Sequence, residues 1–411
     1  MRVLIVTVGS EGDLQPFLAL GKRLLAAGHD VTLSASDGYA ARADAVGVPF
    51  AGRPTWSEAE FQENYRRIAG SKDQLRQLSD VIEFLAKEQR AAVPRLMELA
   101  RDADVVVNSP LAIGAVAAAR AVGTPHVAVH HTWPLRRARG YGPTNIDFGP
   151  LGNALAWSIV GSGVRRATDS RLNPVVTAAG LPPWRNVLFD ASHSPLLNLI
   201  AISPHTRRHD PLFGPTYRTT GYWFLDEPEY TPPDDLAAFV AGEPPVVIGF
   251  GSNNGFDAGA VTRQLLTAIR GLNRRVVLLS GWAGLGAEDV PSNVFLAGFV
   301  PHGWLYARAA CVVHHGGAGT TAAAFRAGIP QAVVWLQGDQ LHWGRQIARL
   351  GAGPAPRSHH ALDAGWLRGA FDRLLGDGGM TDRARALGAA IRREDGTGMA
   401  VRAIEEVSVA T

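Results

Sequence analysis

The sequence predicts an α/β protein with two domains, each built on a parallel sheet, that face each other across a cleft. The chain has 411 residues, which at roughly 150 residues per domain corresponds to about 2.7 domains. Short, continuously apolar strands alternate with helical segments in both halves, as in parallel sheets covered on both faces. A segment rich in proline and acidic residues, 214–245, separates the two runs of alternation.

The composition excludes several classes of protein. Hydrophobic residues make up 46% of the chain and charged residues 19%, which fits large buried cores and excludes a disordered chain. The 40 basic and 37 acidic residues leave a net charge of +3 without a long basic block, so no nucleic-acid partner is expected. No stretch reaches the roughly 18 consecutive apolar residues of a membrane-spanning helix, and the N-terminus lacks a signal-peptide pattern. We therefore expect a soluble, cytoplasmic protein with no integral membrane segment.

The first half begins with a strand, a loop and a helix. An apolar run predicts a strand at 3–8, GSEGD forms the loop, and a helix is expected from about Leu14 to Ala27, ending at Gly28. Further strands are expected at 30–34, 104–108 and 126–130. Two insertions follow, one with amphipathic helical patterns and one rich in glycine, proline and tryptophan, at 57–101 and 133–190. Such insertions commonly shape ligand clefts.

The second half repeats the alternation, with strands expected at 246–250, 275–280, 293–298, 310–315 and 331–335. The single cysteine, Cys311, has apolar neighbours and no cysteine to pair with, so we expect it to be a small buried side chain. The two halves open alike, with VLIVTVGS and VVIGFGS. Ligands of open parallel sheets bind outside the carboxyl ends of the strands, so we expect a cleft lined by strand-end loops.

The most informative stretch is CVVHHGGAGTTAAAFRAGIP at 311–330. A buried strand leads into a loop with three glycines, and a helix is expected to open at Thr320. Glycines let backbone N–H groups approach an anion, and a helix N-terminus favours one, so the stretch fits a phosphate site. A tight strand-to-helix turn alone would also explain the glycines. The imidazole of His315, entering the loop, favours the phosphate site.

Polar side chains follow two other predicted strands. Asp339 and Gln340 come after the strand at 331–335, and a neighbouring acid and amide suit hydrogen bonds to sugar hydroxyls, although such a pair is also common in solvated loops. Asp13 lies where the first strand leads into a helix. It could cap that helix or act as a general base facing the cleft, and the residues alone leave both roles open.

With these motifs the sequence resembles the GT-B fold nucleotide-sugar glycosyltransferases of family 1, in the branch of the sterol glucosyltransferases and actinobacterial antibiotic glycosyltransferases. The likeness spans nearly the whole chain and is carried by GSEGDLQPFLALGKRLLAAGHDVTLSA, GFVPHGWL, HHGGAGTTAAAFRAGIP and GDQLHWGRQIARLGAGP. It implies two Rossmann-like domains, an acceptor-binding one at 1–215 and a nucleotide-sugar-binding one at 244–395. A linker is expected at 216–243, and a C-terminal helix at 396–411 is expected to pack back on the first domain.

The resemblance also implies donor-binding residues. Ser10 and Ser252 are expected near the phosphates, and the pyrophosphate is expected to be bound by His315, Gly317, Gly319 and Thr320. Phe299 and Val300 are expected at the nucleobase. The acid–amide pair Asp339 and Gln340 is expected at the sugar.

Asp13 falls where this branch keeps its catalytic base. The implied reaction is metal-independent and inverting: Asp13 takes the proton of an acceptor hydroxyl as that oxygen attacks the anomeric carbon and displaces the nucleoside diphosphate. His131, Trp56 and Trp133 are expected beside the acceptor, a lipophilic small molecule such as a polyketide, macrolide, sterol or flavonoid. No cofactor is implied, since the nucleotide sugar is a co-substrate. We expect a monomer or a homodimer.

Two positions depart from the family pattern, and the histidine pairs do not suit a metal site. Ala323 stands where many relatives carry a glutamate for the ribose hydroxyls, so UDP-sugars and dTDP-sugars both stay open as donors. Glu11 stands where close relatives often have arginine. The adjacent histidine pairs at 130–131 and 359–360 would point to opposite faces of a strand, so no metal site is expected.

Three other functions fit parts of the sequence. The segment GAGTTA at 317–322 fits the G-x-G-x-x-A fingerprint of an NAD(P)-dependent oxidoreductase, but the acid about twenty residues on, Asp339, lies past the end of the next strand. A non-catalytic sugar-nucleotide-binding partner would not need Asp13. A sugar-nucleotide epimerase or hydrolase of the same fold would not need an apolar acceptor wall.

Overall fold

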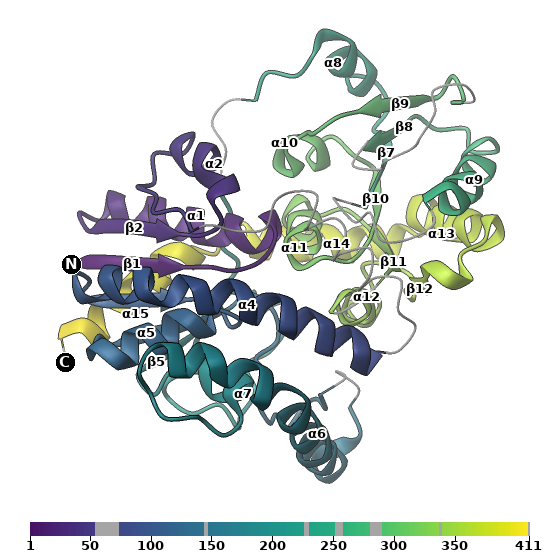
Figure 1. The fold of residues 1–411 in the computed structure, drawn as a ribbon. Helices are drawn as coiled ribbons and strands as arrows, with labels where there is room; N and C mark the ends of the chain where they lie inside the picture. The colour runs from purple at the N-terminus through teal and green to yellow at the C-terminus, as the bar shows by residue number, and fades with distance from the viewer. Residues whose placement is uncertain are drawn as a thin grey trace. The chain divides into compact units, whose positions relative to one another are not determined.

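Parallel strands form two six-stranded sheets, one in each of the two units into which the chain folds (Figure 1). The computed structural model describes residues 1–53, 74–143, 147–225, 230–250, 258–279, 290–336 and 339–409. Unit 1 comprises the described residues up to Leu225 and those from Glu394 onward, and unit 2 comprises the described residues between them. The predicted α/β class with two parallel sheets is confirmed.

The sheet of unit 1 has the order β2-β1-β3-β4-β5-β6. Its strands are β1 (Arg2–Val6), β2 (Asp30–Ser34), β3 (Val105–Asn108), β4 (His126–His130), β5 (Leu197–Ile200) and β6 (Tyr217–Thr219). Every strand pair is parallel. Two isolated parallel bridges, Leu33 to Phe50 and Ser36 to Arg53, continue the sheet beyond β2.

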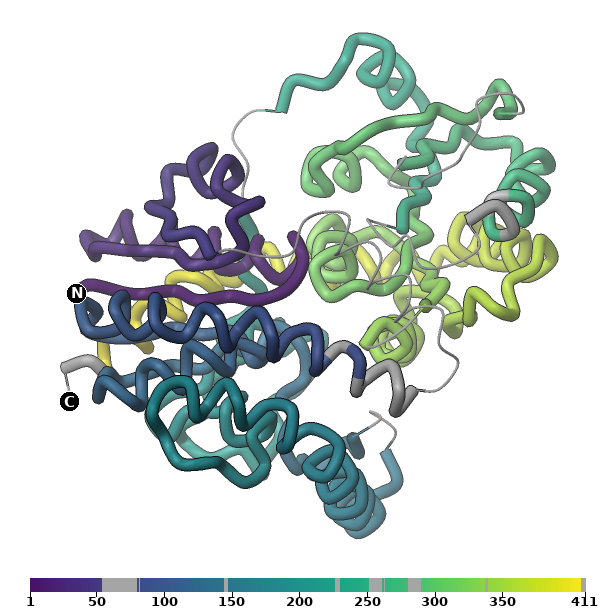
Figure 2. Tube along the Cα trace, viewed as in Figure 1, coloured from purple at the N-terminus to yellow at the C-terminus, as the bar shows by residue number. Residues whose placement is uncertain are grey.

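Successive side chains of β1 point to opposite faces of this sheet, as the two-residue period of a strand requires. Val3 and Ile5 pack with α1 (Glu11–Ala26) and α15 (Gly396–Val409), whereas Leu4 and Val6 pack with α4 (Gln74–Arg101) and α5 (Ile113–Val122). The remaining helices of this unit are α2 (Ala40–Asp44), α6 (Gly149–Ala178) and α7 (Val187–Ala191), with a 3-10 turn at Asp37–Tyr39. Figure 2 shows the yellow α15 beside the purple N-terminal segment, and α1 and α15 are in contact.

The sheet of unit 2 has the order β12-β11-β10-β7-β8-β9, again with parallel pairs only. Its strands are β7 (Val246–Gly249), β8 (Val276–Leu279), β9 (Val294–Ala297), β10 (Cys311–His314), β11 (Gln331–Trp335) and β12 (Arg357–Ser358). Numbered from the first strand of the unit, this is the order 3-2-1-4-5-6 read from the other edge, which is typical of dinucleotide-binding folds. Cys311 is fully buried, and burial raises the pKa of its thiol to about 12.

Helices cover both faces of the second sheet. α9 (Ala258–Ile269) and α13 (Ala364–Gly376) pack on one face. On the other lie α8 (Asp234–Val240), α10 (His302–Tyr306) and α11 (Ala318–Ala327). The unit also contains α12 (Gln340–Arg349), α14 (Gly378–Ile391) and a 3-10 turn at His359–Ala361.

Several elements differ from their predicted extents. α1 begins at Glu11 rather than near Leu14, because Ser10 is already extended and serves as the N-cap. α11 begins at Ala318, ahead of Thr320, because Gly317 takes the N-cap position. The segment 133–190, which shows no clear periodicity, contains the 30-residue helix α6. Its glycines obscure the helical pattern, while Pro150 occupies the first turn, where proline is tolerated.

Two elements, β6 and α8, lie within 216–243, the segment expected to be a linker. β6 pairs with β5 in the sheet of unit 1, and α8 packs in the core of unit 2. Within the described ranges, no helix is both long enough and apolar enough to cross a bilayer.

Candidate active site

The topology of each sheet marks one place for a ligand. In open parallel sheets, ligands bind at the carboxyl ends of the two strands that flank the point where strand order reverses. In unit 1 these strands are β1 and β3, and the loop after β1 carries Ser10 and leads into the first turn of α1, which carries Asp13. In unit 2 they are β7 and β10, and the loop after β10 carries His315. The three side chains predicted from the sequence therefore lie at the reversal points.

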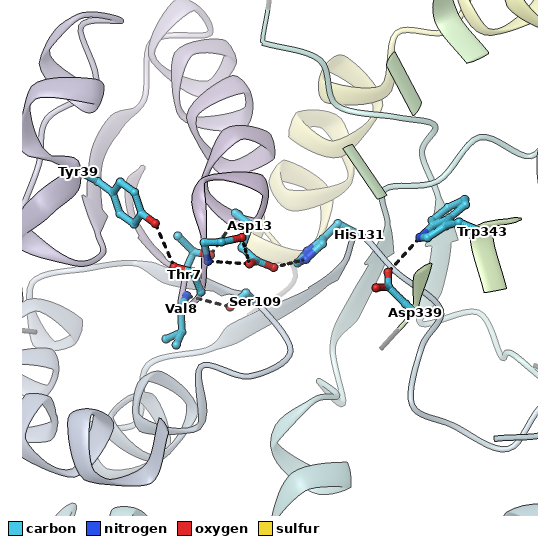
Figure 3. A network of polar contacts seen from close by, with 10 residues as sticks. Thr7, Val8, Asp13, Tyr39, Ser109, His131, Asp339 and Trp343 are labelled. Atoms are coloured by element: carbon cyan, nitrogen blue, oxygen red, sulfur yellow. Dashed lines mark hydrogen bonds and ion pairs between the residues drawn. The ribbon is translucent and has the colours of Figure 1, made fainter. Parts of the chain in front are cut away.

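Asp13 is held by two residues (Figure 3). It occupies the third position of α1, and its Oδ2 accepts hydrogen bonds from the backbone N–H of Ser10 at 2.8 Å and from the Ser10 hydroxyl at 3.0 Å. Its Oδ1 lies 2.9 Å from Nε2 of His131, which follows β4. Asp13 therefore caps its own helix and also pairs with His131, so the two roles left open by the sequence occur together.

The same contacts set the charge of Asp13. Burial raises the pKa of this carboxyl group, but the hydrogen bond and charge of His131 and the two contacts from Ser10 outweigh it, so the pKa lies below its ordinary value. The Asp13 side chain is 34% exposed, against 13% for His131, whose Nδ1 is buried. Asp13 is thus an ionised carboxylate that solvent can reach.

Further contacts fix the loop that carries Asp13. The Thr7 hydroxyl donates to the Asp13 carbonyl at 3.3 Å, and the buried guanidinium of Arg53 donates to the Thr7 carbonyl at 2.6 Å. The Tyr39 hydroxyl donates to the Gly9 carbonyl at 3.3 Å. These bonds approach the loop from two other segments of unit 1, so its shape does not depend on α1 alone.

Glu11, which differs from the arginine expected from the family pattern, has a basic partner. Arg42 of α2 donates from Nε to Oε1 of Glu11 at 2.9 Å. The pair places a basic side chain beside the first turn of α1.

In unit 2, the loop after β10 has the geometry of an anion site. Gly316 has a φ of 89°, a left-handed conformation that favours glycine. The first bond within α11 runs from the Thr321 N–H to the Gly317 carbonyl at 2.9 Å. The three preceding N–H groups of this helix, of Ala318, Gly319 and Thr320, therefore have no acceptor within the helix and point outward from its N-terminus.

The ring of His315 lies over this loop. A side chain added at Gly317 would collide with its Nε2, so the imidazole occupies the space above the glycine. Burial, together with the charge of His302, lowers the pKa of His315 to about 4, which keeps the ring neutral at pH 7. His302, the first residue of α10, was not identified from the sequence; its place in GFVPHGWL is the only signal.

The predicted sugar-binding pair lies beside the phosphate loop. A Cβ built on Gly316 would lie 2.8 Å from the Gln340 carbonyl oxygen, so the two segments are in direct contact. Asp339 occupies the N-cap position of α12, and its Oδ2 accepts a hydrogen bond from the Trp343 indole at 3.0 Å (Figure 3). Gln340 is buried, and its Oε1 accepts from the Leu336 N–H at 2.8 Å. Both side chains thus have fixed orientations.

The two residues expected at the nucleobase differ in exposure. Phe299 is 76% exposed, which leaves its ring open for stacking. Val300 is buried in the core of unit 2 and can offer only its backbone to a ligand.

The residues expected at the acceptor do not all lie at one place. His131 lies against Asp13, as described. Trp133 lines a small hollow in unit 1, whose other walls include Tyr141, Ile202, Arg207 and Phe213. The Arg207 guanidinium lies 5.1 Å from the Trp133 ring and 4.1 Å from the Tyr141 ring. Two other predicted residues, Trp56 and Ser252, lie outside the described residues.

The two histidine pairs have different environments. His130 is buried and stacks on Tyr217, whereas its neighbour His131 faces Asp13. His359 and His360 lie in a 3-10 turn rather than on a strand, and their ring centroids are 3.8 Å apart, so the expectation that this pair points to opposite faces is wrong. No group of three or more histidine, cysteine, aspartate or glutamate side chains suited to a metal ion occurs in the part of the chain that the structure describes.

Comparison with known families gives two matches that together cover much of the chain. Residues 3–130 match the N-terminal domain of glycosyltransferase family 28. Residues 263–398 match the C-terminal domain of proteins like the erythromycin biosynthesis protein CIII.

Individual relatives extend the match over the whole chain. The O-mycaminosyltylonolide 6-deoxyallosyltransferase of Streptomyces fradiae is 32% identical over 99% of this chain and 97% of its own length. A sterol 3-beta-glucosyltransferase of Arabidopsis thaliana is 31% identical over 98% of this chain and 67% of its own length. This chain covers only 29% of a longer fungal relative, the sterol 3-beta-glucosyltransferase of Sclerotinia sclerotiorum.

Solved structures agree on the fold. The glycosyltransferase of kitacinnamycin superposes with a TM-score of 0.77 at 19% identity, covering 99% of this chain and 98% of the other. The glycosyltransferase VinC, solved in complex with dTDP, gives 0.72 at 18% identity over the full length of both chains.

Fold and site together define a nucleotide-sugar glycosyltransferase with the GT-B fold. The chain belongs to the glycosyltransferase family that contains the sterol glucosyltransferases and the macrolide antibiotic glycosyltransferases. The predicted family and fold are thereby confirmed, and the dinucleotide-dependent oxidoreductase is not supported.

Proposed function

We propose that the protein transfers a sugar from a nucleoside-diphosphate donor to a hydroxyl group of a lipophilic small molecule, with inversion and without a metal ion. The observation that carries this proposal is Asp13, an ionised and partly exposed carboxylate in the first turn of α1, one of whose oxygens is held by His131. One positioned base contributes about 10² to 10⁴-fold in rate.

The roles of the two partners follow from their exposure. Asp13 takes the proton of the acceptor hydroxyl, because it is the more exposed partner. His131 orients the carboxylate and balances its charge. In unit 2 the diphosphate is bound by the N-terminus of α11 and by His315, where negative charge grows as the leaving group departs. Asp339 and Gln340 bind the sugar, and Phe299 stacks on the base.

The donor is a UDP-sugar or a dTDP-sugar. Support for dTDP comes from Ala323, which has no carboxylate for a ribose hydroxyl, and from relatives solved with dTDP or thymidine diphosphate. The acceptor belongs to the polyketide, macrolide, sterol or flavonoid class. A cytoplasmic location and a monomeric or homodimeric state stay predictions.

The first test is a thermal-shift measurement with UDP, dTDP, GDP and NADH at equal concentrations, because a ligand that binds only the folded state raises the melting temperature. A shift with UDP or dTDP supports the proposal, and the larger of the two identifies the donor class. A shift with NADH alone would contradict it. Transfer of sugar to a panel of polyketide, macrolide, sterol and flavonoid alcohols then identifies the acceptor.

A further inference from the structure

His314, the neighbour of the predicted phosphate-binding histidine, has no role in the function proposed above, yet it is fully buried at the end of β10. Its ring makes two hydrogen bonds. Nδ1 lies 3.0 Å from the backbone nitrogen of Gly316, and Nε2 lies 2.9 Å from Oε1 of Gln331. Gln331 is the first residue of the adjacent strand β11 and is equally buried.

These two bonds fix the tautomer of the ring. A backbone N–H can only donate, so Nδ1 must carry a lone pair to accept from Gly316. The proton therefore lies on Nε2 and is donated to the amide oxygen of Gln331. Burial, followed by the charge of His315, lowers the pKa of His314 to about 3, so the ring is neutral at pH 7.

Gly316 is the residue at which the phosphate loop turns. Its φ of 89° favours glycine, and any Cβ there would lie 2.7 Å from Cγ1 of Val333 and 2.8 Å from the Gln340 carbonyl oxygen. The chain between β10 and α11 thus passes through a tight gap in one conformation. Gln340, on the other side of that gap, belongs to the predicted sugar-binding pair.

We propose that His314 is a positioning residue of the nucleoside-diphosphate site: it holds Gly316 in its turn, so that His315 and the first N–H groups of α11 face the diphosphate. Gln331 maintains the tautomer that makes this bond possible. The inference rests on the proposed function, because it assumes that a diphosphate binds at this loop. It adds two buried residues to the site, neither of which touches the ligand.

Two variants with amide side chains test the two hydrogen bonds of His314 one at a time. In His314→Asn, the amide oxygen can take the place of Nδ1 and accept from Gly316, while the contact with Gln331 is lost. In His314→Gln, the longer amide can reach Gln331, while the acceptor for Gly316 is lost. His126→Asn, which replaces a buried histidine in unit 1, is the matched control for the general cost of such a change.

The first measurement is amide hydrogen exchange of Gly316 in protein without nucleotide, which tests the turn independently of any ligand. We expect Gly316 to lose protection in His314→Gln and to keep most of it in His314→Asn and His126→Asn. Equal protection in His314→Gln and the wild type would overturn the inference.

The second measurement is calorimetric titration with UDP and dTDP. The nucleotide that binds the wild type should bind His314→Gln about tenfold to a hundredfold more weakly, the range expected when a buried donor loses its acceptor, and His314→Asn should recover most of this loss. Unchanged affinity in His314→Gln, or an equal loss in both variants, would overturn the positioning role. If neither nucleotide binds the wild type, the proposed function fails, and the part of the inference that assigns a diphosphate to this loop fails with it. The exchange result still decides whether His314 holds the turn.

Discussion

Oδ1 of Asp13 and Nε2 of His131 lie 2.9 Å apart, although 118 positions separate the two residues in the chain. They meet because β1 and β4 are parallel strands of one sheet, so the segments after them emerge at the same edge. The Asp13–His131 pair is the structural basis of the first two predictions.

Replacing Asp13 by asparagine should lower the rate of sugar transfer by about 10² to 10⁴-fold, the contribution of a positioned base. The amide oxygen of asparagine can still accept from the Ser10 N–H, so α1 keeps its cap and the fold is retained. Steady-state kinetics measures the effect, and titration with the nucleotide should give an unchanged dissociation constant. Near-normal turnover in this variant would remove Asp13 as the base.

Replacing His131 by phenylalanine should shift the acid limb of the pH–rate profile upward. His131 lowers the pKa of Asp13, whereas burial raises it, so loss of the histidine leaves a carboxylate with a higher pKa. Because the base must be ionised, lowering the pH should abolish the activity of the variant at a pH at which the wild type is still active. The measurement is kcat/KM against pH between about 4 and 9. An unchanged acid limb would show that the pair does not set the charge of Asp13.

Gly316→Ala and Gly319→Ala form a matched pair of substitutions in one loop. The first introduces a side chain at a φ of 89° and against two neighbours, whereas a Cβ at Gly319 meets nothing within 4 Å. We expect Gly316→Ala to reduce the free energy of unfolding by about 1 to 3 kcal/mol and to weaken nucleotide binding. Gly319→Ala should leave stability within about 0.5 kcal/mol of the wild type. Urea denaturation measures both, and equal stabilities would contradict the close packing of Gly316.

Phe299→Ala should weaken nucleotide binding without changing stability. The ring is 76% exposed and therefore contributes little to the core, but stacking of an aromatic side chain on a base is worth about 1 to 3 kcal/mol. Calorimetry with the nucleoside diphosphate checks the first half of the prediction, and thermal denaturation checks the second. Leu212→Ala, which truncates another exposed apolar side chain, is the control. Equal affinities for the two variants would exclude Phe299 from the site.

Unit 1 should lose stability as the pH falls from 6.5 toward 4. Burial lowers the pKa of His126 and of His193 to about 4, and that of His130 further, whereas in the unfolded chain these rings have pKa values near 6.5. Between the two values the unfolded state binds more protons than the folded state, so the free energy of unfolding decreases by several kcal/mol in total. Urea midpoints at pH 7.5, 6 and 5 measure the effect. His126→Leu should reduce the slope and the exposed His209→Leu should not; equal slopes would refute the assignment.

Much of the fold follows from short-range patterns. Most strands are largely apolar runs of four or five residues, and the phosphate loop is a contiguous motif, so these can be predicted from the sequence. β5, β6 and β12 are not predicted; β6 and β12 have only three and two residues and contain polar side chains, so no apolar run marks them. The helix α6 is not predicted, because its glycines interrupt the helical pattern. Its buried residues, such as Leu172, share a core with residues of α4, α5 and α7, which lie far away in the sequence.

The candidate site likewise has one part that the sequence predicts and another part that it does not. His315 is the last residue of a predicted strand, and Asp13 and Asp339 each follow one within five residues, so their places near strand ends can be read from the sequence. The pairing of Asp13 with His131, of Glu11 with Arg42 and of His314 with Gln331 depends on which strands and helices become neighbours, and no local pattern specifies that.

The position of α15 constrains the order in which the protein can fold as it leaves the ribosome. Ala400, Ala403 and Ile404 are buried in the same core as Val3 and Phe17, so unit 1 is assembled from both the earliest and the latest residues described. All of unit 2 is synthesised before α15 emerges. Until α15 emerges, unit 1 therefore keeps an apolar face of its core open, and this core is the last of the two to close.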